Sequence, residues 1–490
     1  MNQLTDQPIQ PQDNSVSPER PNAQPPSDTR VAEASAKYLA KTAGTATPVS
    51  SACLPGYKLT EVGVIPEDWD VLKGHQLFIK IQDGTHFSPK VSGGEFLYVT
   101  SKNIKFGYLD INSAGFIDRT QHESIYKRCD VRKMDILLTK DGANTGNAAL
   151  NTLSEPFSLL SSVAFMRLDL DIHSPEFFLQ QILSNNFQKY IQDEMSGNAI
   201  TRLTLKKINH LNFFVPSRKE QTAIANALSD MDALIGGLEN LIAKKQAIKT
   251  ATMQQLLTGR TRLPQFALRE DGTHKGYKQS ELGEIPEDWE VVYLSECGEF
   301  QSGNGFPTKY QGLKEGKYPF FKVSDMNNSG NEKFLINSNN YISDYVRSLI
   351  SARVIAVNSI IFAKIGAAIF LERKKICSQP SCIDNNMMAF SADENKLHHE
   401  YAYLLFMSIN LGDLVEATAL PSLSGRDIGR RKIALPTRNE QTAIATILSD
   451  MDEEIQALQQ RLEKTRQIKQ GMMQELLTGR TRLVKPEQAA

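Results

Sequence analysis

The chain has 490 residues, of which 40% are hydrophobic and 23% charged, values ordinary for globular protein with room for roughly two to four domains. The formal net charge is −1, so overall charge does not indicate that the chain binds nucleic acid. A polyanion would have to bind at a local basic patch or with the help of a partner chain. No apolar run is long enough to cross a bilayer. Five cysteines without zinc-ligand spacing favour free thiols in a reducing cytoplasm.

Residues 1–55 are rich in Pro, Gln, Ser and Asn. Such a composition cannot bury a core and predicts a disordered leader, in which Val31 to Ala43 could form a weak isolated helix. From residue 56 to 215 the pattern changes to short apolar and β-branched runs between turn residues. Phe96–Val99 and Ile136–Leu138 are predicted strands, and Pro175 to Tyr190 is a predicted helix that Ser174 would cap.

Residues 216–263 predict a long helical segment that ends at Gly259, and residues 264–276 a linker. A second domain follows over residues 277–435, with predicted strands at Pro319–Val323, Val354–Val357 and Ile360–Phe362, and a predicted helix at Glu400–Ile409. Residues 436–483 predict a second long helix that ends at Gly479, before a tail of residues 484–490.

Each long helix carries an apolar stripe with the alternating spacing of four and three residues that an a/d seam requires. The seam residues are Ile224, Leu228, Met231, Ile235, Leu238 and Ile242 in the first helix, and Ile444, Leu448, Met451, Ile455, Leu458 and Leu462 in the second. The helices could pack on their own domains. The narrow, equivalent stripes favour packing of the two helices on each other.

The strongest feature of the chain is an internal repeat with a constant offset of 220 residues. Ile65-Pro66-Glu67-Asp68-Trp69 returns at 285–289, Glu220-Gln221-Thr222-Ala223-Ile224 at 440–444, and the eight residues from Leu256 to Leu263 at 476–483. A period this long means duplication of a whole domain with its helix, since solenoid repeats are much shorter. Between these repeats the two interiors differ, which favours a common frame that presents two different surfaces. Drift after duplication is the alternative, since it would produce the same contrast.

These motifs resemble the specificity subunit of type I DNA restriction–modification enzymes over residues 57–483. The resemblance rests on the Gly-x-Ile-Pro-Glu-x-Trp start of each domain (from Gly63 and Gly283) and on the exit loops, residues 197–203 and 421–426. It also rests on the Pro-x-x-x-Glu-Gln-x-x-Ile start of each helix (from Pro216 and Pro436) and on the Leu-Leu-Thr-Gly-Arg close. The 55-residue leader departs from the simplest pattern of the family and gains no function from it.

The resemblance implies an α+β fold with two mixed α/β target-recognition domains in pseudo-two-fold repeat, held apart by an antiparallel coiled-coil pair. Each domain would read one half of a split, asymmetric site in double-stranded DNA. The chain itself would be non-catalytic and bind no cofactor. It would assemble with two methyltransferase subunits and two motor-nuclease subunits, which would use S-adenosylmethionine, ATP and Mg²⁺.

The residues agree with a non-catalytic chain, because no adenine-methyltransferase tetrapeptide and no Walker A motif occur. DNA reading needs side-chain donors and amides on loops. The predicted contacts of the first domain are Lys80, His86, Ser101, Lys102, Asn103, Lys105, Lys140, Asn144, Asn147 and Arg202. Those of the second are Asn304, Lys322, Ser324, Asn327, Lys364, Asn385, Asn386, Ser424 and Arg426. Arg202 and Arg426 are the strongest candidates, because both lie in the exit loops; no metal site is predicted.

A helix from Lys219 to Leu257 would be about 58 Å long, which limits the separation of the two domains to about 17 base pairs. Domains on one face of the duplex would favour half-site centres about 10 base pairs apart. Two alternatives stay open: a coiled-coil adaptor that binds proteins with its two domains, and a fused enzyme that both reads and cuts.

Overall fold

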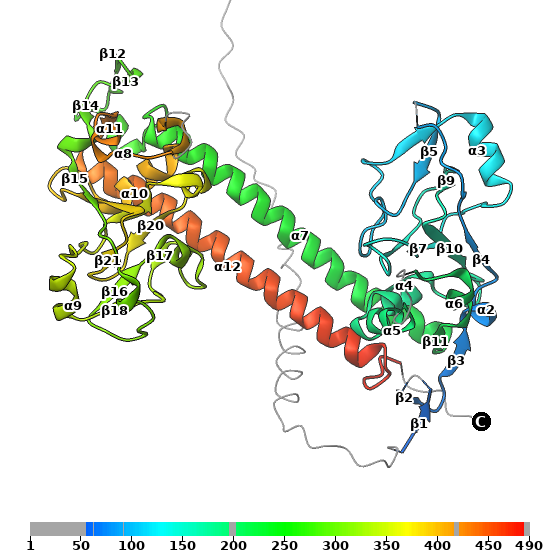
Figure 1. Ribbon diagram of the computed structural model, residues 1–490. Helices are drawn as coiled ribbons and strands as arrows, with labels where there is room; N and C mark the ends of the chain where they lie inside the picture. Colours follow the sequence, from blue (N-terminus) through cyan, green and yellow to red (C-terminus); the bar gives the residue numbers. More distant parts are fainter. Residues whose placement is uncertain (1–54, 62, 92, 196–201, 416–420, 485–490) are drawn as a thin grey trace, which may run out of the picture. The chain divides into compact units, whose positions relative to one another are not determined.

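The computed structural model describes residues 55–61, 63–91, 93–195, 202–415 and 421–484 (Figure 1). The predicted leader and its helix lie outside these residues, as do most of the first exit loop and most of the tail. The chain divides into two compact units, residues 1–231 with 466–490, and residues 232–465. Each unit therefore holds one domain, called a head below, together with the start of one long helix and the end of the other.

The first head is a mixed unit built on a four-stranded sheet of order β4-β10-β7-β8 and a three-stranded sheet of order β6-β5-β9. All neighbours in these sheets are antiparallel except β5 and β9. Two smaller sheets pair β1 with β2 and β3 with β11. The strands are β1 (Tyr57–Thr60), β2 (Gly63–Pro66), β3 (Asp70–Lys73), β4 (Lys80–Asp83), β5 (Phe96–Val99), β6 (Gly115–Ile117), β7 (Ile136–Thr139), β8 (Ala148–Leu150), β9 (Ser158–Leu159), β10 (Val163–Arg167) and β11 (Asn212–Val215). The helices are α2 (Gly74–Leu77), α3 (Arg119–Tyr126), α4 (Pro175–Leu183), α5 (Asn185–Met195) and α6 (Leu205–His210).

The second head repeats this plan with a five-stranded sheet of order β15-β22-β19-β20-β17 and a three-stranded sheet of order β18-β16-β21. The strands are β12 (Tyr277–Ser280), β13 (Gly283–Pro286), β14 (Glu290–Tyr293), β15 (Gly298–Ser302), β16 (Tyr318–Phe321), β17 (Phe334–Leu335), β18 (Tyr341–Ile342), β19 (Ile360–Ala363), β20 (Lys374–Cys377), β21 (Cys382–Ile383), β22 (Met387–Ala392) and β23 (Lys432–Leu435). The α-helices are α8 (Pro264–Ala267), α9 (Asp344–Leu349), α10 (His399–Ser408) and α11 (Gly425–Gly429), and the 3₁₀ helices are η1 (Leu294–Glu296), η2 (Thr308–Tyr310), η3 (Val323–Asn327), η4 (Gly366–Leu371) and η5 (Gly412–Leu414).

Two sequence predictions of local structure are wrong. The helix predicted from Pro175 to Tyr190 is two helices, α4 and α5, because Ser184 is extended and its hydroxyl bonds the carbonyl of Gln181. The strand predicted at Val354–Val357 is a loop with one isolated bridge, at Ile355, since Asn358 turns the chain with a φ of 66°. The turn follows so closely that this apolar run pairs with the neighbouring segment at one residue only, Ile355 with Ser381.

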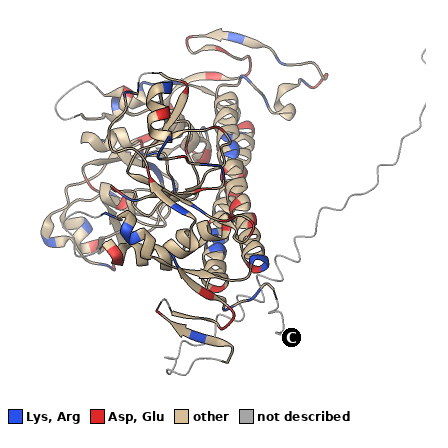
Figure 2. Ribbon diagram, turned by 90° about the vertical axis from the view of Figure 1, so that its right-hand side faces the viewer, with Lys and Arg blue, Asp and Glu red and all other residues tan. Residues whose placement is uncertain are grey.

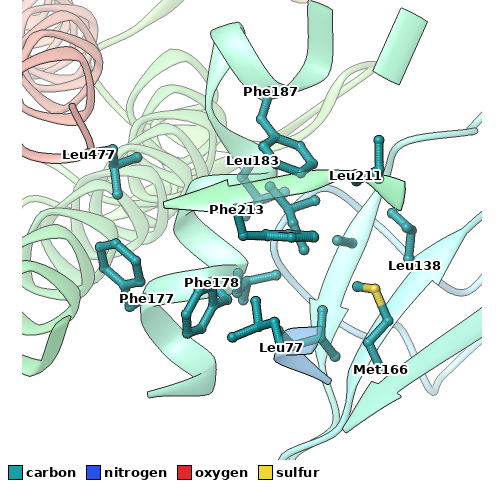
Figure 3. Packing of buried hydrophobic residues seen from close by; sticks show 14 of the residues in the cluster. Leu77, Leu138, Met166, Phe177, Phe178, Leu183, Phe187, Leu211, Phe213 and Leu477 are labelled. Atoms are coloured by element: carbon teal, nitrogen blue, oxygen red, sulfur yellow. The ribbon is translucent and has the colours of Figure 1, made fainter. Parts of the chain in front are cut away.

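The core of the first head is aromatic and lies between α4, β11 and the four-stranded sheet (Figure 3). Phe177 and Phe178 from α4 are fully buried there and pack near Phe213 of β11. Leu476 and Leu477, some 260 residues further along the chain, belong to the same cluster. The second head is closed in the same way by Leu256 and Leu257.

The long helices α7 (Arg218–Leu257) and α12 (Arg438–Leu476) begin in one unit and end in the other. Their first turns pack on the heads: Ile224 and Leu228 lie in the first core, Ile444 and Leu448 in the second. Further along, within the second unit, one cluster joins the two helices. Its members are Ile235, Leu238, Ile242, Ile455, Leu458 and Leu462. Met231 is partly exposed, and Met451 packs against the second core.

Two ion pairs show how α7 and α12 are oriented relative to each other within the second unit. Lys245 pairs with Glu454 at 2.7 Å, and Lys249 pairs with Asp452. A later residue in α7 thus meets an earlier one in α12, so the two helices run antiparallel there. The predicted helix stops hold as well, with Gly259 and Gly479 at φ of 69° and 68°.

A buried arginine closes the second unit. Arg262, three residues after Gly259, donates from Nε and Nη2 to both carboxylate oxygens of Glu440, at 2.6 and 2.8 Å. It also donates to Asp288 at 2.8 and 3.2 Å and lies over the ring of Trp289. Trp289 Nε1 donates to the same Glu440 at 3.0 Å, and Lys275 donates to Asp288 at 2.8 Å. We call this arrangement the second clasp.

The first unit has the equivalent arrangement, the first clasp, made by Arg482. Arg482 donates to Glu220 at 2.6 and 2.8 Å and to Asp68 at 2.9 and 2.7 Å. Trp69 Nε1 donates to Glu220 at 3.1 Å. The three motifs that repeat along the sequence therefore meet in space, and each clasp takes its arginine from the helix that follows the other head.

Candidate nucleic-acid interface

Several loops of the first head meet where strands β4, β5, β7 and β9 end. Gly84 N–H donates to the carbonyl of Val163 at 3.2 Å, and Thr85 N–H donates to Leu159 at 2.8 Å. Ser161 N–H returns a bond to the Thr85 carbonyl at 2.8 Å. The loop after β4 is thus held against the loop that joins β9 to β10.

The loop after β7 joins the same edge. Lys140 N–H donates to the carbonyl of Ser162, and the Lys140 carbonyl accepts from Leu203 N–H, both at 2.9 Å. Asp141 and Arg202 form an isolated antiparallel bridge. The described end of the exit loop is therefore fixed beside the end of β7, and α6 begins two residues later with Thr204 as its N-cap.

Four of these backbone hydrogen bonds have counterparts in the second head. Gly303 N–H donates to Met387 at 3.1 Å and Asn304 N–H to Ile383 at 3.0 Å. Lys364 N–H donates to Asn386, and its carbonyl accepts from Leu423 N–H, both at 2.8 Å. Because these four bonds correspond, the two heads share a backbone frame at this edge although their sequences differ.

One residue of this frame has to be glycine in both heads. A Cβ built on Gly84 would lie 2.0 Å from the Leu159 carbonyl oxygen, and one on Gly303 would lie 2.0 Å from the Asp384 carbonyl oxygen. No side chain fits at those distances, so the close approach of the two loops depends on glycine. Lys140 and Lys364 are then equivalent, as are Asp83 and Ser302, which precede the two glycines.

The shared frame shows which residues of the two heads correspond. Arg202 and Arg426 are not equivalent: the bridge of Asp141 to Arg202 corresponds to that of Ile365 to Ser422, so Ser422 is the counterpart of Arg202. Arg426 lies on the first turn of α11, the counterpart of α6.

The loops after β5 and after β16 begin with corresponding turns. Asn103 Oδ1 accepts from Thr100 N–H at 2.9 Å, and Asp325 Oδ2 accepts from Lys322 N–H at 2.8 Å. Residues 101–104 therefore correspond to residues 323–326. Asn103 closes this turn with its amide oxygen and Asp325 closes the corresponding turn with its carboxylate. A comparison of residue identities does not reveal that the two side chains have the same role.

The first head pairs its cations with carboxylates at this edge. Lys140, only 2% exposed, donates to Asp141 at 2.8 Å and lies 3.6 Å from Asp83. Arg128, from the turn after α3, donates to Asp83 at 2.7 Å. Arg202 Nε lies 2.7 Å from Asp141 Oδ1, as an ion pair without hydrogen-bond alignment.

Other predicted contacts of the first head are placed as follows. Lys80 pairs with Asp130, His86 lies 3.4 Å from Asp83, and Lys105 lies 3.8 Å from Asp110. Asn103 is buried in its turn, and Asn147 donates to the Ile104 carbonyl at 3.2 Å. Ser101 is half-buried, and Lys102 and Asn144 are exposed.

In the second head, Lys364 donates to the hydroxyl of Ser302 at 3.1 Å. Asn304 donates to the Ser351 carbonyl at 3.0 Å, Lys322 donates to Gln311 at 3.2 Å, and Ser424 caps α11. Asn386 donates to Asp384 at 3.4 Å. The exposed candidates are Ser324, Asn327, Asn385, Ser424 and Arg426.

Two aspartates near these edges have shifted pKa values. Burial alone would raise the pKa of Asp130, but hydrogen bonds from Lys80 and Arg167 outweigh burial and lower that pKa to about 2. Lys80 is thereby committed to a structural pair. Burial raises the pKa of Asp384, although hydrogen bonds from Asn386 oppose the rise.

Sequence reasoning missed Arg128 and Asp141, because neither stands out in a motif. The hydrogen-bond frame also brings Ser161 and Ser162 to the edge, as the counterparts of Asn385 and Asn386. Only the register of the strands identifies these positions. Basic and acidic residues are mixed along the heads and helices, as the overall charge predicted (Figure 2).

Two heads that share a backbone frame and carry different loop side chains define a bipartite recognition protein. A family model described as the type I restriction modification DNA specificity domain matches residues 66–249 and again residues 286–467. The chain belongs to this family. Its function is sequence-specific DNA recognition in a type I restriction–modification system, and it is not the catalytic component.

Similar proteins agree with this assignment. The type I restriction enzyme MjaVIII specificity subunit of Methanocaldococcus jannaschii is 28% identical over 433 residues, which cover 86% of this chain and 94% of that protein. The putative MjaX specificity subunit of the same organism is 26% identical, with 87% and 97% covered. The fold resembles the crystal structure of the type I restriction–modification S subunit from M. genitalium, at 16% identity and a TM-score of 0.51, with 86% of this chain and 98% of that chain covered.

A further solved chain, from a study of complex assembly and conformational transition of the type I R-M system, matches with a TM-score of 0.51 at 14% identity. It covers 85% of this chain and 99% of its own. Within the residues that the structure describes, no helix has the length and apolar character needed to span a membrane.

Proposed function

We propose that each head reads one part of a bipartite, asymmetric DNA site through the loops at the ends of its strands. The observation that carries this is the shared frame: equivalent backbone bonds on either side of Ser161 in one head and Asn385 in the other, and equivalent turns around Lys102 and Ser324, place unlike side chains at the same positions. A frame that is kept while its exposed side chains change is what two unlike half-sites require.

The exposed members of the predicted set are the best base readers. Lys102, Asn144, Asn327, Asn385 and Arg426 present donors or amides to solvent. Lys140 and Asn103 are buried and support their loops, so a direct contact with bases has no support from their positions. Phosphate contacts would add affinity without sequence information.

We further propose that α7 and α12 act as a coiled-coil spacer that sets the gap between the half-sites. Within the second unit, the apolar cluster formed by residues of both helices and the two Lys–carboxylate pairs support this role. The chain would work in the cytoplasm with two methyltransferase and two motor-nuclease subunits. Those partners would bring S-adenosylmethionine, ATP and Mg²⁺.

Methylome sequencing of cells with and without this gene tests the proposal. We expect one bipartite adenine-methylated motif to disappear when the gene is deleted, and half of that motif to change when the loops of one head are exchanged. A deletion strain that keeps every methylated motif, while the partner genes are expressed, would refute the proposal. Loss of the motif only after disruption of the helices, and never after loop exchange, would favour the protein-adaptor alternative.

The spacer is tested by deleting one heptad from each helix, residues 237–243 and 457–463, which the 220-residue offset makes equivalent. Seven helical residues span about 10.5 Å, or about three base pairs. We expect the gap to shorten by about that amount or the site to be lost. Deleting a heptad from α7 alone is the matched control, because it puts the apolar cluster out of register. An unchanged gap in the double deletion would contradict the spacer model.

A further inference from the structure

The two heads differ in charge at one equivalent position of the shared frame. Lys140 and Lys364 both follow a central strand and make the same two backbone hydrogen bonds. Lys140 faces two carboxylates, Asp83 and Asp141, whose counterparts in the second head are Ser302 and Ile365. These two positions beside the lysine are thus acidic in the first head and neutral in the second.

This difference changes the partners of the cations at this position. In the first head Asp141 lies between two cations, with Lys140 on Oδ2 and Arg202 on Oδ1. In the second head Lys364 donates to a neutral hydroxyl, and among the described residues it pairs with no carboxylate. A carboxylate that forms an ion pair with a guanidinium occupies the position that a phosphate oxygen would take in a complex with DNA.

We propose that Asp141 is a positioning residue that acts as an electrostatic brake in the first head, and that Lys364 is the unbraked cation of the second head and contacts a phosphate of duplex DNA. The inference rests on the proposed function. Asp141 holds Arg202 by its ion pair and keeps Lys140 inward. DNA must displace Asp141 from Arg202 before that guanidinium can reach a phosphate.

Exchange of the two side chains gives a reciprocal test. Asp141→Asn removes the charge and keeps the shape, which frees Arg202. Ile365→Asp installs a carboxylate beside Lys364, at a position whose extended φ of −133° and ψ of 137° at the start of η4 suits aspartate. Ile365→Asn is the matched control, since it can cap the same turn without a charge.

The measurement is the affinity of the full-length chain, alone and copurified with its methyltransferase partner, for a fluorescein-labelled 40-base-pair duplex pool of random sequence. Titrations between 50 and 300 mM salt give the slope of log K against log salt. One more phosphate contact steepens that slope by about 0.9. We expect Asp141→Asn to steepen it by about that amount and to raise affinity about two- to fivefold. Ile365→Asp should flatten it by a similar amount, and Ile365→Asn should leave it near that of the wild type.

The outcomes separate the two proposals. Slopes that stay the same in Asp141→Asn and Ile365→Asp, in a wild type that binds duplex and methylates its motif, overturn the brake and leave the proposed function standing. Equal flattening by Ile365→Asp and Ile365→Asn also overturns it, because the effect would then come from lost packing. A wild-type complex that binds no duplex at 50 mM salt, with no motif lost from the methylome, refutes the proposed function and the brake with it.

Discussion

Removal of the clasp arginines is expected to destabilise each unit strongly and separately. Arg262→Ala leaves Glu440, which is 1% exposed, with one remaining hydrogen bond from Trp289. Arg482→Ala leaves Glu220 in the same state, with Trp69. An uncompensated buried charge of this kind costs about 3–5 kcal/mol.

The two clasps should not respond equally. The Arg262 side chain is 6% exposed and that of Arg482 is 19% exposed, so water can replace more of what Arg482 supplies. We expect about 3–5 kcal/mol for Arg262→Ala and about 2–4 kcal/mol for Arg482→Ala. Arg→Lys at either position keeps the charge but loses the bidentate fork, and should give an intermediate loss.

The chain offers its own probes, because its two tryptophans lie one in each clasp. Urea unfolding followed by fluorescence reports the second unit in a Trp69→Phe background and the first unit in a Trp289→Phe background. With a slope near 2–3 kcal/mol per M, a loss of 3–5 kcal/mol moves the midpoint by about 1–2 M. The two units require separate fits, since a chain with two units need not unfold in one transition.

Arg260→Ala and Arg480→Ala are the matched controls, because these exposed neighbours belong to the same motif. Each should shift the midpoint by about 0.5 kcal/mol or less in free energy. A midpoint unchanged in Arg262→Ala, or moved as far by Arg260→Ala, would refute the reasoning.

Two more predictions follow from the frame and the second clasp. Gly303→Ala places a Cβ against backbone at 2.0 Å, so the second half-site should lose its methylation while the first half still directs DNA binding; methylation at an unchanged motif would contradict this. Burial alone would raise the pKa of Asp288, but Arg262 and Lys275 lower it to about 2, so its contribution of about 2 kcal/mol is complete above pH 4 and disappears as the pH falls toward 2. Urea midpoints between pH 2 and 5 should show this loss in the wild type and a smaller one in Asp288→Asn.

Much of the frame could be predicted from the sequence, because repetition marks it. The long helices, β5, β7 and the glycine stops followed from periodicity and turn residues, and the family assignment followed from four repeated motifs. The interface could not be predicted as well. Its equivalences lie in backbone bonds: Asp83 matches Ser302, and Arg202 matches Ser422, although no residue identity connects them.

The clasps show what the three repeated motifs do together. Each repeat, taken alone, predicted a local role: a domain start, a helix start and a helix stop. In the structure Asp68 and Trp69 come from the first motif, Glu220 from the second and Arg482 from the third, and they form a single contact. A substitution in any one of them would leave a buried charge or an empty place in that contact, so the three motifs are constrained together.

The sequence alone leaves open which copies combine, since Trp69 could meet either Arg262 or Arg482. The structure shows the exchanged arrangement, in which each head is closed by the helix that follows the other head. Both long helices are therefore needed to complete both heads. A deletion that shortens only one helix must disturb a head as well as the spacer, and for this reason the spacer experiment shortens both by the same heptad.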